Sequence, residues 1–100
     1  AYIDREWRYV RANATYLDWL GREPGQLVGQ RLDDVLDAGQ LATMRPNARR
    51  ALRGEHVCYR TTLDHRRLGR RDVEVTLLPD EDVGGTVNGF FAIINDCSAD

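Results

Sequence analysis

The chain is 100 residues long, 42% hydrophobic and 30% charged, with a formal net charge of −2. These values predict one globular domain over residues 1–100, and no apolar run reaches the length of a membrane helix. All basic residues are arginines, and acidic residues outnumber them, so the basic excess typical of a nucleic-acid-binding domain is missing. Cys58 and Cys97 lie far apart, which predicts two small buried thiols in a reducing compartment and no disulfide.

Two short strands and a capped helix are expected first. Residues 2–4 suit one strand, and alternation over residues 7–12 predicts a second. Asn13 suits the N-cap of a helix over residues 14–20, because its side-chain oxygen can accept a backbone N–H of the first turn. Gly21 is a typical helix end.

Three further helical segments follow. Proline is favoured in a first turn, so Pro24 predicts a helix over residues 24–28, and residues 32–36 give one more turn. The longest helical pattern covers residues 39–53. Pro46 lies inside it, lacks an N–H and crowds the preceding turn, so a kink or a restart is expected there.

The rest of the chain is predicted to be strand. Alternation indicates strands over residues 57–63 and 73–77, with a hairpin turn around Gly69 and a strand end before Pro79, and an apolar run after a glycine pair indicates the last strand, over residues 86–95. Strand, strand, short helices and three antiparallel strands is the order of an α+β domain whose helices lie on one face of the sheet.

Alternation also assigns side chains to the sheet face that meets the helices. The expected inward residues are Val57, Tyr59, Val75, Leu77, Phe91 and Ile93. The side chains expected to cover them are Trp19, Leu36, Met44 and Leu52.

Five segments, in this order, resemble PAS domains of the bacterial type. They are NATYLDWLG (13–21), GQRLDDVL (29–36), ALRGEHVCY (51–59), VEVTLLPDED (73–82) and GFFAIINDCS (89–98). The last segment ends in Asp96-Cys97-Ser98, where PAS domains commonly have Asp-Ile-Thr. The resemblance covers essentially the whole chain and implies a five-stranded antiparallel sheet with a cluster of short helices on one face.

The resemblance implies a sensor. In PAS domains the space between helices and sheet can hold a small molecule, haem or flavin, and the last strand passes a signal to an effector. This chain would then be a module excised from a larger cytoplasmic signalling protein, for example a protein of a two-component system. Its effector would be a histidine kinase, a nucleotide cyclase or a transcription regulator. A homodimer is expected, without contact of this domain to nucleic acid or membrane. The alternative is a PAS-fold dimerisation or protein-interaction module with no ligand.

The resemblance also implies a site. The residues expected in a ligand pocket are Tyr9, Arg11, Trp19, Met44, Tyr59, Thr61, Val75, Phe91 and Ile93. The ligand should be small and largely apolar, with a polar contact from Tyr9, Arg11, Tyr59 or Thr61. A buried Arg11 would need a partner, either an anionic group of the ligand or an internal acid. Asp96 and Ser98, at the end of the last strand, are expected to relay the signal.

No cofactor or metal is predicted. The helical region over residues 14–53 contains neither a cysteine for flavin adduct chemistry nor a histidine for an axial haem ligand. His56 and His65 both follow that region, and His56 with Cys58 is too small a set for a zinc site. A small organic ligand is compatible with the sequence.

Catalysis is not predicted either. Ser98 is the single serine, and no nucleophile, base and orienter form a recognisable pattern, so the chain is not expected to be an enzyme. Four arginines of the hairpin around Gly69 could contact a phosphate backbone: Arg66, Arg67, Arg70 and Arg71. Because Asp64 and Asp72 flank them, a solvated turn is favoured.

Overall fold

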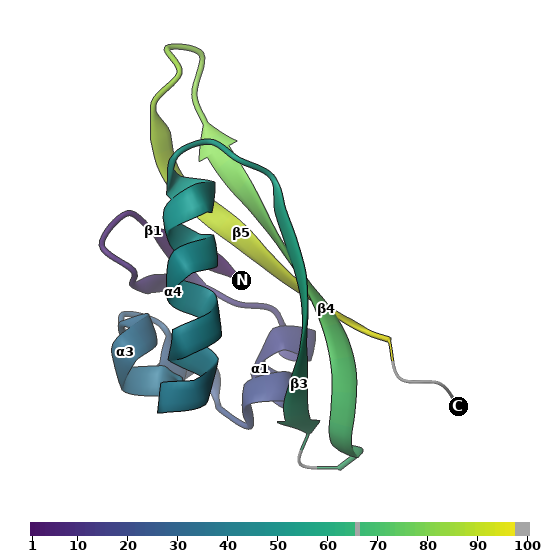
Figure 1. Cartoon of the computed structure of the whole chain (residues 1–100). Helices are drawn as coiled ribbons and strands as arrows, with labels where there is room; N and C mark the ends of the chain where they lie inside the picture. The colour runs from purple at the N-terminus through teal and green to yellow at the C-terminus, as the bar shows by residue number, and fades with distance from the viewer. Residues whose placement is uncertain (66, 98–100) are drawn as a thin grey trace.

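The computed structural model describes residues 1–65 and 67–97. These residues form one antiparallel sheet of five strands, in the order β2-β1-β5-β4-β3, and four helices (Figure 1). The strands are β1 (Tyr2–Asp4), β2 (Tyr9–Arg11), β3 (Val57–His65), β4 (Gly69–Glu81) and β5 (Val87–Asp96). The helices, which connect β2 to β3, are α1 (Ala14–Leu20), α2 (Pro24–Leu27), α3 (Leu32–Val35) and α4 (Ala38–Leu52). The predicted α+β class and the five-stranded antiparallel sheet are confirmed.

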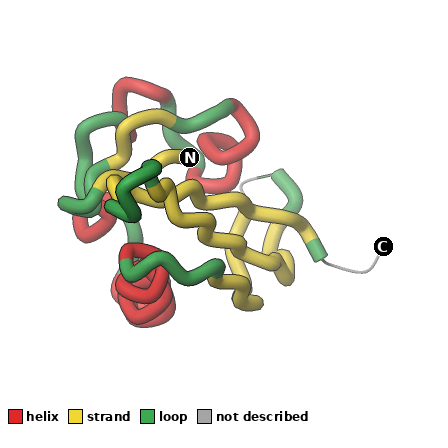
Figure 2. The backbone as a smooth tube through the Cα atoms, turned by 90° about the horizontal axis from the view of Figure 1, so that it is seen from above, coloured by secondary structure: helices red, strands yellow, loops and turns green. Residues whose placement is uncertain are grey.

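The longest helix, α4, covers much of the sheet. It packs against β3, β4 and β5, and Figure 2 shows it end-on beside the strands. Its buried residues are Leu41, Met44, Ala48 and Ala51. Because they are three or four positions apart, they form one apolar stripe along the helix. Asp37 and Gln40 form a capping box that fixes where the helix begins.

A restart of α4 at Pro46 and a strand end before Pro79, both expected from the sequence, are absent. α4 continues through Pro46 without a restart. Pro46 and Ala42 are both exposed, so the Ala42 carbonyl that loses its N–H partner can be hydrated. β4 likewise continues through Pro79. β3 pairs with β4 only as far as Leu77, so one edge of β4 is free beyond that point and a missing N–H is tolerated.

The predicted sheet faces are right for β3 and β4 and wrong for β5. Val57, Val75 and Leu77 are buried, and Tyr59 is partly buried against the core. Within the apolar run of β5, Phe90 and Ala92 are buried, whereas Phe91 and Ile93 are 38% and 41% exposed on the opposite face. Residues 90–94 are all apolar, so this stretch shows no alternation from which its inner face could be assigned.

The residues expected to cover the sheet lie where predicted. Trp19 and Met44 are buried, and Leu36 and Leu52 are partly buried against the core. The cysteines differ from expectation: both are free thiols, but Cys58 is exposed and Cys97 is only partly buried. Cys58 occupies an outward position of β3, opposite Thr76.

β1 and β5 approach each other closely at Gly89. A Cβ at this position would lie 2.4 Å from the Ile3 carbonyl oxygen and 2.9 Å from the Tyr2 ring. Tyr2 covers the glycine and donates a hydrogen bond from its hydroxyl to Asp80 at 2.6 Å. The absence of a side chain at Gly89 therefore allows β1 to pair with β5 in this register.

Candidate functional site

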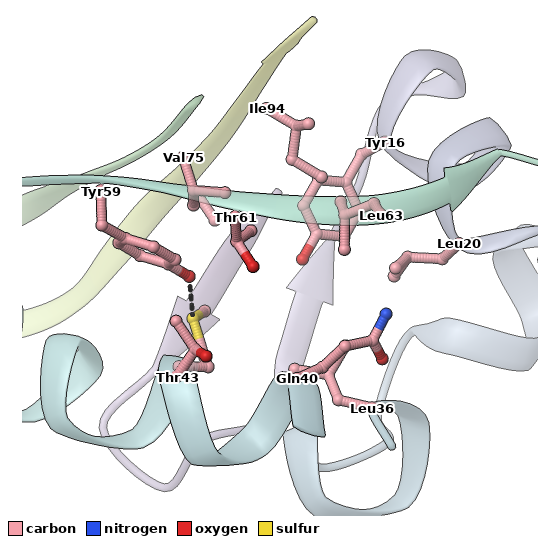
Figure 3. A pocket seen from close by; sticks show the side chains of 12 residues that line it. Tyr16, Leu20, Leu36, Gln40, Thr43, Tyr59, Thr61, Leu63, Val75 and Ile94 are labelled. Carbon is pink, nitrogen blue, oxygen red and sulfur yellow. Dashed lines mark hydrogen bonds between the residues drawn. The ribbon is translucent and has the colours of Figure 1, made fainter. Parts of the chain in front are cut away.

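The candidate site is an apolar pocket between the inner face of the sheet and α4, with a cavity volume of about 50 Å³ (Figure 3). Its floor comes from three strands and consists of Leu63, Val75, Ala92 and Ile94. Larger hollows are also present: one of about 260 Å³ shares Tyr16, Ala92 and Ile94 with this pocket, one of about 340 Å³ shares Gln40 and Thr61 with it, and one of about 300 Å³ lies apart. We take the pocket under α4 as the candidate because its lining is largely apolar with a few convergent polar groups, the usual composition of a ligand site.

Strand and helix periodicity place the polar side chains of this pocket. Alternation along β3 turns Tyr59 and Thr61 toward α4, on the same face as Leu63. On α4, Gln40 lies one turn before Met44, so both reach the pocket from the same side of the helix.

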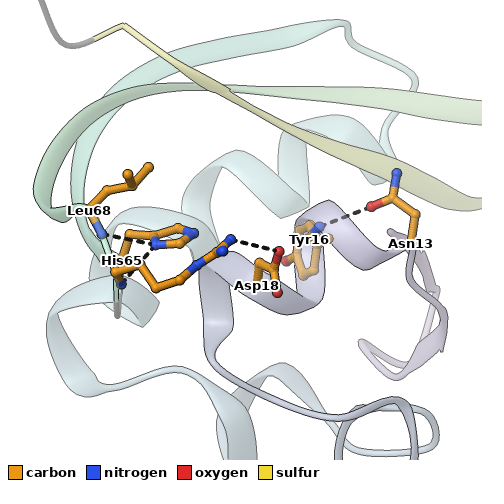
Figure 4. Close-up of polar contacts among 6 residues, drawn as sticks. Asn13, Tyr16, Asp18, His65 and Leu68 are labelled. Atoms are coloured by element: carbon orange, nitrogen blue, oxygen red, sulfur yellow. Dashed lines mark hydrogen bonds and ion pairs between the residues drawn. The ribbon is translucent and has the colours of Figure 1, made fainter. Parts of the chain in front are cut away.

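Two buried tyrosines share a hydrogen bond at the α1 end of the pocket. The hydroxyl oxygens of Tyr9 and Tyr16 are 2.8 Å apart, and either can be the donor. Asn13 positions Tyr16, because its Oδ1 accepts the Tyr16 backbone N–H at 2.9 Å (Figure 4). Burial raises the pKa of Tyr9 to about 12 and raises the pKa of Tyr16 well above its usual value. Both hydroxyls therefore keep their protons at neutral pH.

A second contact joins β3 to α4 at the other end of the pocket. The Tyr59 hydroxyl donates a hydrogen bond to the Met44 sulfur at 3.2 Å, drawn as a dashed line in Figure 3. Burial raises the pKa of Tyr59, so this hydroxyl also stays neutral. Most of the residues that line the pocket are only partly buried, so the pocket is in contact with solvent.

The pocket is uncharged, and its polar lining residues are Tyr16, Gln40, Thr43, Tyr59 and Thr61. None of the described residues that line it is an acid, an arginine or a histidine. The Tyr16 hydroxyl, the Thr61 hydroxyl and the Gln40 amide point into it (Figure 3). Gln40 Oε1 accepts the Asp37 backbone N–H at 2.9 Å. Within residues 1–65 and 67–97, neither Gln40 Nε2 nor the Thr61 hydroxyl has a hydrogen-bond partner.

The residues predicted for the ligand pocket are distributed over several places. Those that line it are Met44, Tyr59, Thr61 and Val75. Tyr9 does not line the pocket, but its hydroxyl is hydrogen-bonded to the hydroxyl of Tyr16, which does. Trp19 and Ile93 line a second hollow, and Arg11 and Phe91 line a third. Whether any of these residues contacts a ligand stays a prediction.

Arg11 is exposed, so the expectation that it turns into the pocket is wrong. Tyr9 pairs with Ile3 whereas Arg11 pairs with the adjacent Tyr2, so Val10 is an extra residue in β2. Such a bulge re-aims the side chain that follows it. The Arg11 guanidinium consequently lies 5.5 Å from the centre of the Tyr2 ring. An anionic ligand group paired with a buried Arg11 is therefore excluded.

Several lining residues were missed by the sequence analysis. They are Tyr16, Leu20, Leu36, Gln40, Thr43, Leu63, Ala92 and Ile94. A signal existed for some of them: Leu63 continues the alternation of Tyr59 and Thr61, and Gln40 precedes Met44 by one helical turn. The sequence contains no alternation that identifies Ala92 and Ile94 as inward, because all residues from 90 to 94 in β5 are apolar.

The end of β5 is held to β4 by an ion pair. Arg71 Nε and one of its terminal nitrogens each lie 3.0 Å from Asp96 Oδ2. Asp96 therefore attaches the C-terminal end of β5 to the neighbouring strand β4. Ser98 lies outside the described residues. A relay role for Asp96 and Ser98 stays a prediction.

The hairpin between β3 and β4 is fastened to α1 (Figure 4). The buried His65 accepts the backbone N–H groups of Arg67 and Leu68 at its Nδ1, at 3.1 and 3.3 Å. Its ring meets Trp19 edge-on, with ring centres 4.8 Å apart. Arg67 also pairs with Asp18 at 3.5 Å. Arg70 pairs with Asp64, and Arg66 lies outside the described residues.

The described residues contain neither a metal-binding cluster nor a helix that could span a membrane. No group of three or more histidine, cysteine, aspartate and glutamate side chains there is arranged to hold a metal ion. No helix in the same residues has both the length and the apolar character needed to cross a membrane.

The sequence model of a family described as "PAS fold" matches residues 1–99. No curated protein matches the chain. The VqmA dimer of Vibrio cholerae, solved in the absence of its target DNA, has a TM-score of 0.83 at 18% identity, over 98% of this chain and 45% of that chain. VqmA bound to DPO gives a TM-score of 0.81 at 18% identity, over 96% of this chain and 50% of that chain. This chain thus spans half or less of the VqmA chains.

Two further solved structures cover most of the compared chains. A domain of an HTR-like protein from Haloarcula marismortui ATCC 43049 has a TM-score of 0.75 at 18% identity, over 97% of this chain and 94% of that chain. The PAS domain of Bordetella pertussis BvgS has a TM-score of 0.68 at 18% identity, over 98% of this chain and 72% of that chain. At this identity the similarity concerns the fold.

Proposed function

This chain belongs to the PAS fold family, and on that premise we propose that it is a sensory module that binds a small molecule between its sheet and α4. The signal leaves through β5 to an effector in the same protein, a histidine kinase, a nucleotide cyclase or a transcription regulator. The module acts in the cytoplasm as a homodimer, in a pathway of the two-component kind. It carries no catalytic step and no haem, flavin or metal.

The observation that carries this proposal is the pocket itself. It has an apolar floor, is in contact with solvent and has polar lining groups, of which the Thr61 hydroxyl and the Gln40 NH₂ have no partner among the described residues. VqmA, which has the same fold, has been solved with DPO bound and as a dimer. This supports a ligand-binding dimer here by analogy of fold.

Thermal unfolding against a panel of metabolites tests the binding step. A compound that binds the folded state raises its stability by mass action, by about 2.7 kcal/mol at a hundred times its Kd. Thr61→Phe should remove the shift because its ring would occupy the pocket. Thr62→Phe is the matched control, because Thr62 points to the other face of β3. A shift that survives Thr61→Phe would place the ligand elsewhere, and a panel without any shift would count against sensing.

The relay step requires the longer protein that contains this module. Asp96→Ala removes the contact with Arg71 and should uncouple the stimulus from the output while ligand affinity is kept. Normal signalling by this variant would show that Asp96 is not a relay residue.

A ligand-free dimerisation module is the second candidate. The small cavity favours it, together with the apolar outer sheet face where Phe91 and Ile93 are exposed beside Tyr2. Ile93→Asp should then dissociate a dimer in sedimentation experiments without altering any ligand response. A dimer unaffected by Ile93→Asp would remove this candidate face.

A further inference from the structure

We infer that the pocket selects a small neutral molecule that carries a hydrogen-bond acceptor, and that it rejects anions. This inference rests on the proposed sensory function and narrows the chemical class of the ligand.

The exclusion of anions follows from the charges around the pocket. An anion that enters it loses hydration, and no cation among the described lining residues replaces that hydration. The hydroxyls of Tyr16 and Tyr59, the two tyrosines that line the pocket, are neutral and supply no countercharge. Arg22 is the cation whose charge acts on Tyr9, but its guanidinium donates to the Val35 carbonyl at 3.5 Å and does not line the pocket. Arg11 lies on the outer face of the sheet. Arg70 lines the adjoining hollow that shares Gln40 and Thr61 with the pocket, but it pairs there with Asp64 at 3.9 Å, and Asp37 lines the same hollow, so its positive charge is matched.

The preference for an acceptor follows from which polar atoms are unoccupied. Gln40 Oε1 is engaged by the Asp37 backbone N–H, so the group that Gln40 offers to the pocket is its NH₂ donor. Thr61 adds a hydroxyl without a protein partner in the described chain. A carbonyl oxygen or a ring nitrogen placed between Gln40 and Thr61 would satisfy both groups.

The size of the ligand is limited by the cavity. Its volume is about 50 Å³, whereas a cavity that holds benzene measures roughly 150 Å³. A molecule with one ring therefore requires the pocket to widen. Leu20 and Leu36 are partly buried whereas Met44 is buried, so movement of these two leucines exposes less of the core than separation of Met44 from Tyr59 would. The ligand is thus a single ring or smaller, with its apolar side against Leu63 and Val75.

Three probes of equal ring size test the inference: benzamide, benzoate and toluene, each at millimolar concentration, with binding followed by thermal unfolding and by titration of backbone amide NMR signals. Benzamide should bind, toluene should bind more weakly, and benzoate should not bind at neutral pH. Benzamide affinity should fall about five-fold in Thr61→Val, the effect of one lost hydrogen bond. It should fall by at least as much in Gln40→Glu, where a carboxylate that repels the carbonyl oxygen replaces the NH₂ donor.

Both variants have a matched control. Gln40→Glu keeps an oxygen for the Asp37 N–H and removes the NH₂ donor. Gln26→Glu makes the same change in the capping box of α2, where Gln26 Oε1 accepts the Glu23 N–H at 2.9 Å, and should leave benzamide affinity unchanged. Thr62→Val is the control for Thr61→Val, because Thr62 lies on the outward face of β3.

Each outcome decides a separate point. Benzoate binding as tight as benzamide would overturn the charge selectivity while leaving the sensory function in place. Toluene binding equal to benzamide, insensitive to Thr61→Val, would overturn the acceptor. If none of the three probes binds but a metabolite raises the melting temperature, only this inference fails. If neither the probes nor the metabolites bind, the proposed function fails with it.

Discussion

Gly89 and Trp7 are two positions where the backbone favours glycine, but only one of them has it. At Gly89 the side chain is absent, and the Tyr2 ring occupies the space above the strand. At Trp7 a large side chain is kept although its φ of 65° lies in the left-handed region that favours glycine. Trp7 is partly buried against the core, and the Arg49 guanidinium lies 5.9 Å from its ring centre. These contacts offset the backbone strain, which is on the order of 1–3 kcal/mol.

Gly89→Ala should destabilise the domain by about 1–3 kcal/mol, because the added methyl group would overlap the Ile3 carbonyl oxygen and force β1 away from β5. Chemical denaturation of the two proteins measures the difference. Gly25→Ala is the control: a Cβ there meets no atom within 4 Å and its helix should gain about 0.5–1 kcal/mol. Equal stability of Gly89→Ala and the parent would show that β1 can shift without loss.

Adjacent phenylalanines test the assignment of faces in β5. Phe90→Asp should prevent folding, because a carboxylate in a fully buried position has no partner. Phe91→Asp should leave the domain folded, because Phe91 is 38% exposed on the outer face. Circular dichroism and thermal melts of both variants measure this. Two melts of similar midpoint would contradict the inner and outer assignment.

Among the features of the helices and strands, those with local signals were predictable, whereas the inner face of β5 and the bulge in β2, which depend on strand pairing, were not. Local residues determine the N-cap Asn13, the C-cap Gly21 and the apolar stripe of α4. The predicted bounds of α1 and α4 therefore differ from those in the structure by at most one residue. The inner face of β5 and the bulge at Val10 arise from pairing with β1 and β4, which lie far away in the sequence. The pocket was accordingly predicted on β3 and β4 and missed on β5.

The β3–β4 hairpin should depend on the acceptor that His65 supplies. His65→Phe keeps an aromatic ring against Trp19 but leaves two backbone N–H groups without their acceptor. The free energy of unfolding should fall by about 1–2 kcal/mol, and the amides of Arg67 and Leu68 should exchange hydrogen faster. His65→Asn restores an acceptor near the Nδ1 position and should recover the exchange protection but not the packing on Trp19. Unchanged exchange in His65→Phe would show that water replaces the imidazole.

For the whole molecule, buried tyrosines should limit stability at alkaline pH. The pKa of Tyr9 is about 12 in the folded protein against an ordinary value of 10. Between these values the folded state retains a proton that the unfolded state has lost, so the free energy of unfolding falls as pH rises through this window. The contribution is complete below pH 10 and amounts to about 2–3 kcal/mol. Tyr16 acts in the same direction.

Urea denaturation at a series of pH values between 8 and about 12 measures this dependence. Tyr9→Phe should reduce the decline of stability with pH, since phenylalanine has no proton to lose. Tyr59→Phe provides a comparison, because Tyr59 is less deeply buried than Tyr9 but its pKa is also raised. An identical pH dependence in Tyr9→Phe and the parent would show that this hydroxyl ionises only after unfolding.

The placement of the two tryptophans gives the protein its own optical reporter. Trp19 belongs to α1, the helix that supplies Tyr16 to the pocket, and its indole touches the imidazole of His65. Trp7 lies at the turn between β1 and β2, beneath Arg49. Ultraviolet emission of Trp19 will therefore change when a molecule shifts α1, while Trp7 serves as an internal reference. In Trp7→Phe the remaining emission comes from α1 alone, so occupancy of the pocket can be followed in unlabelled protein.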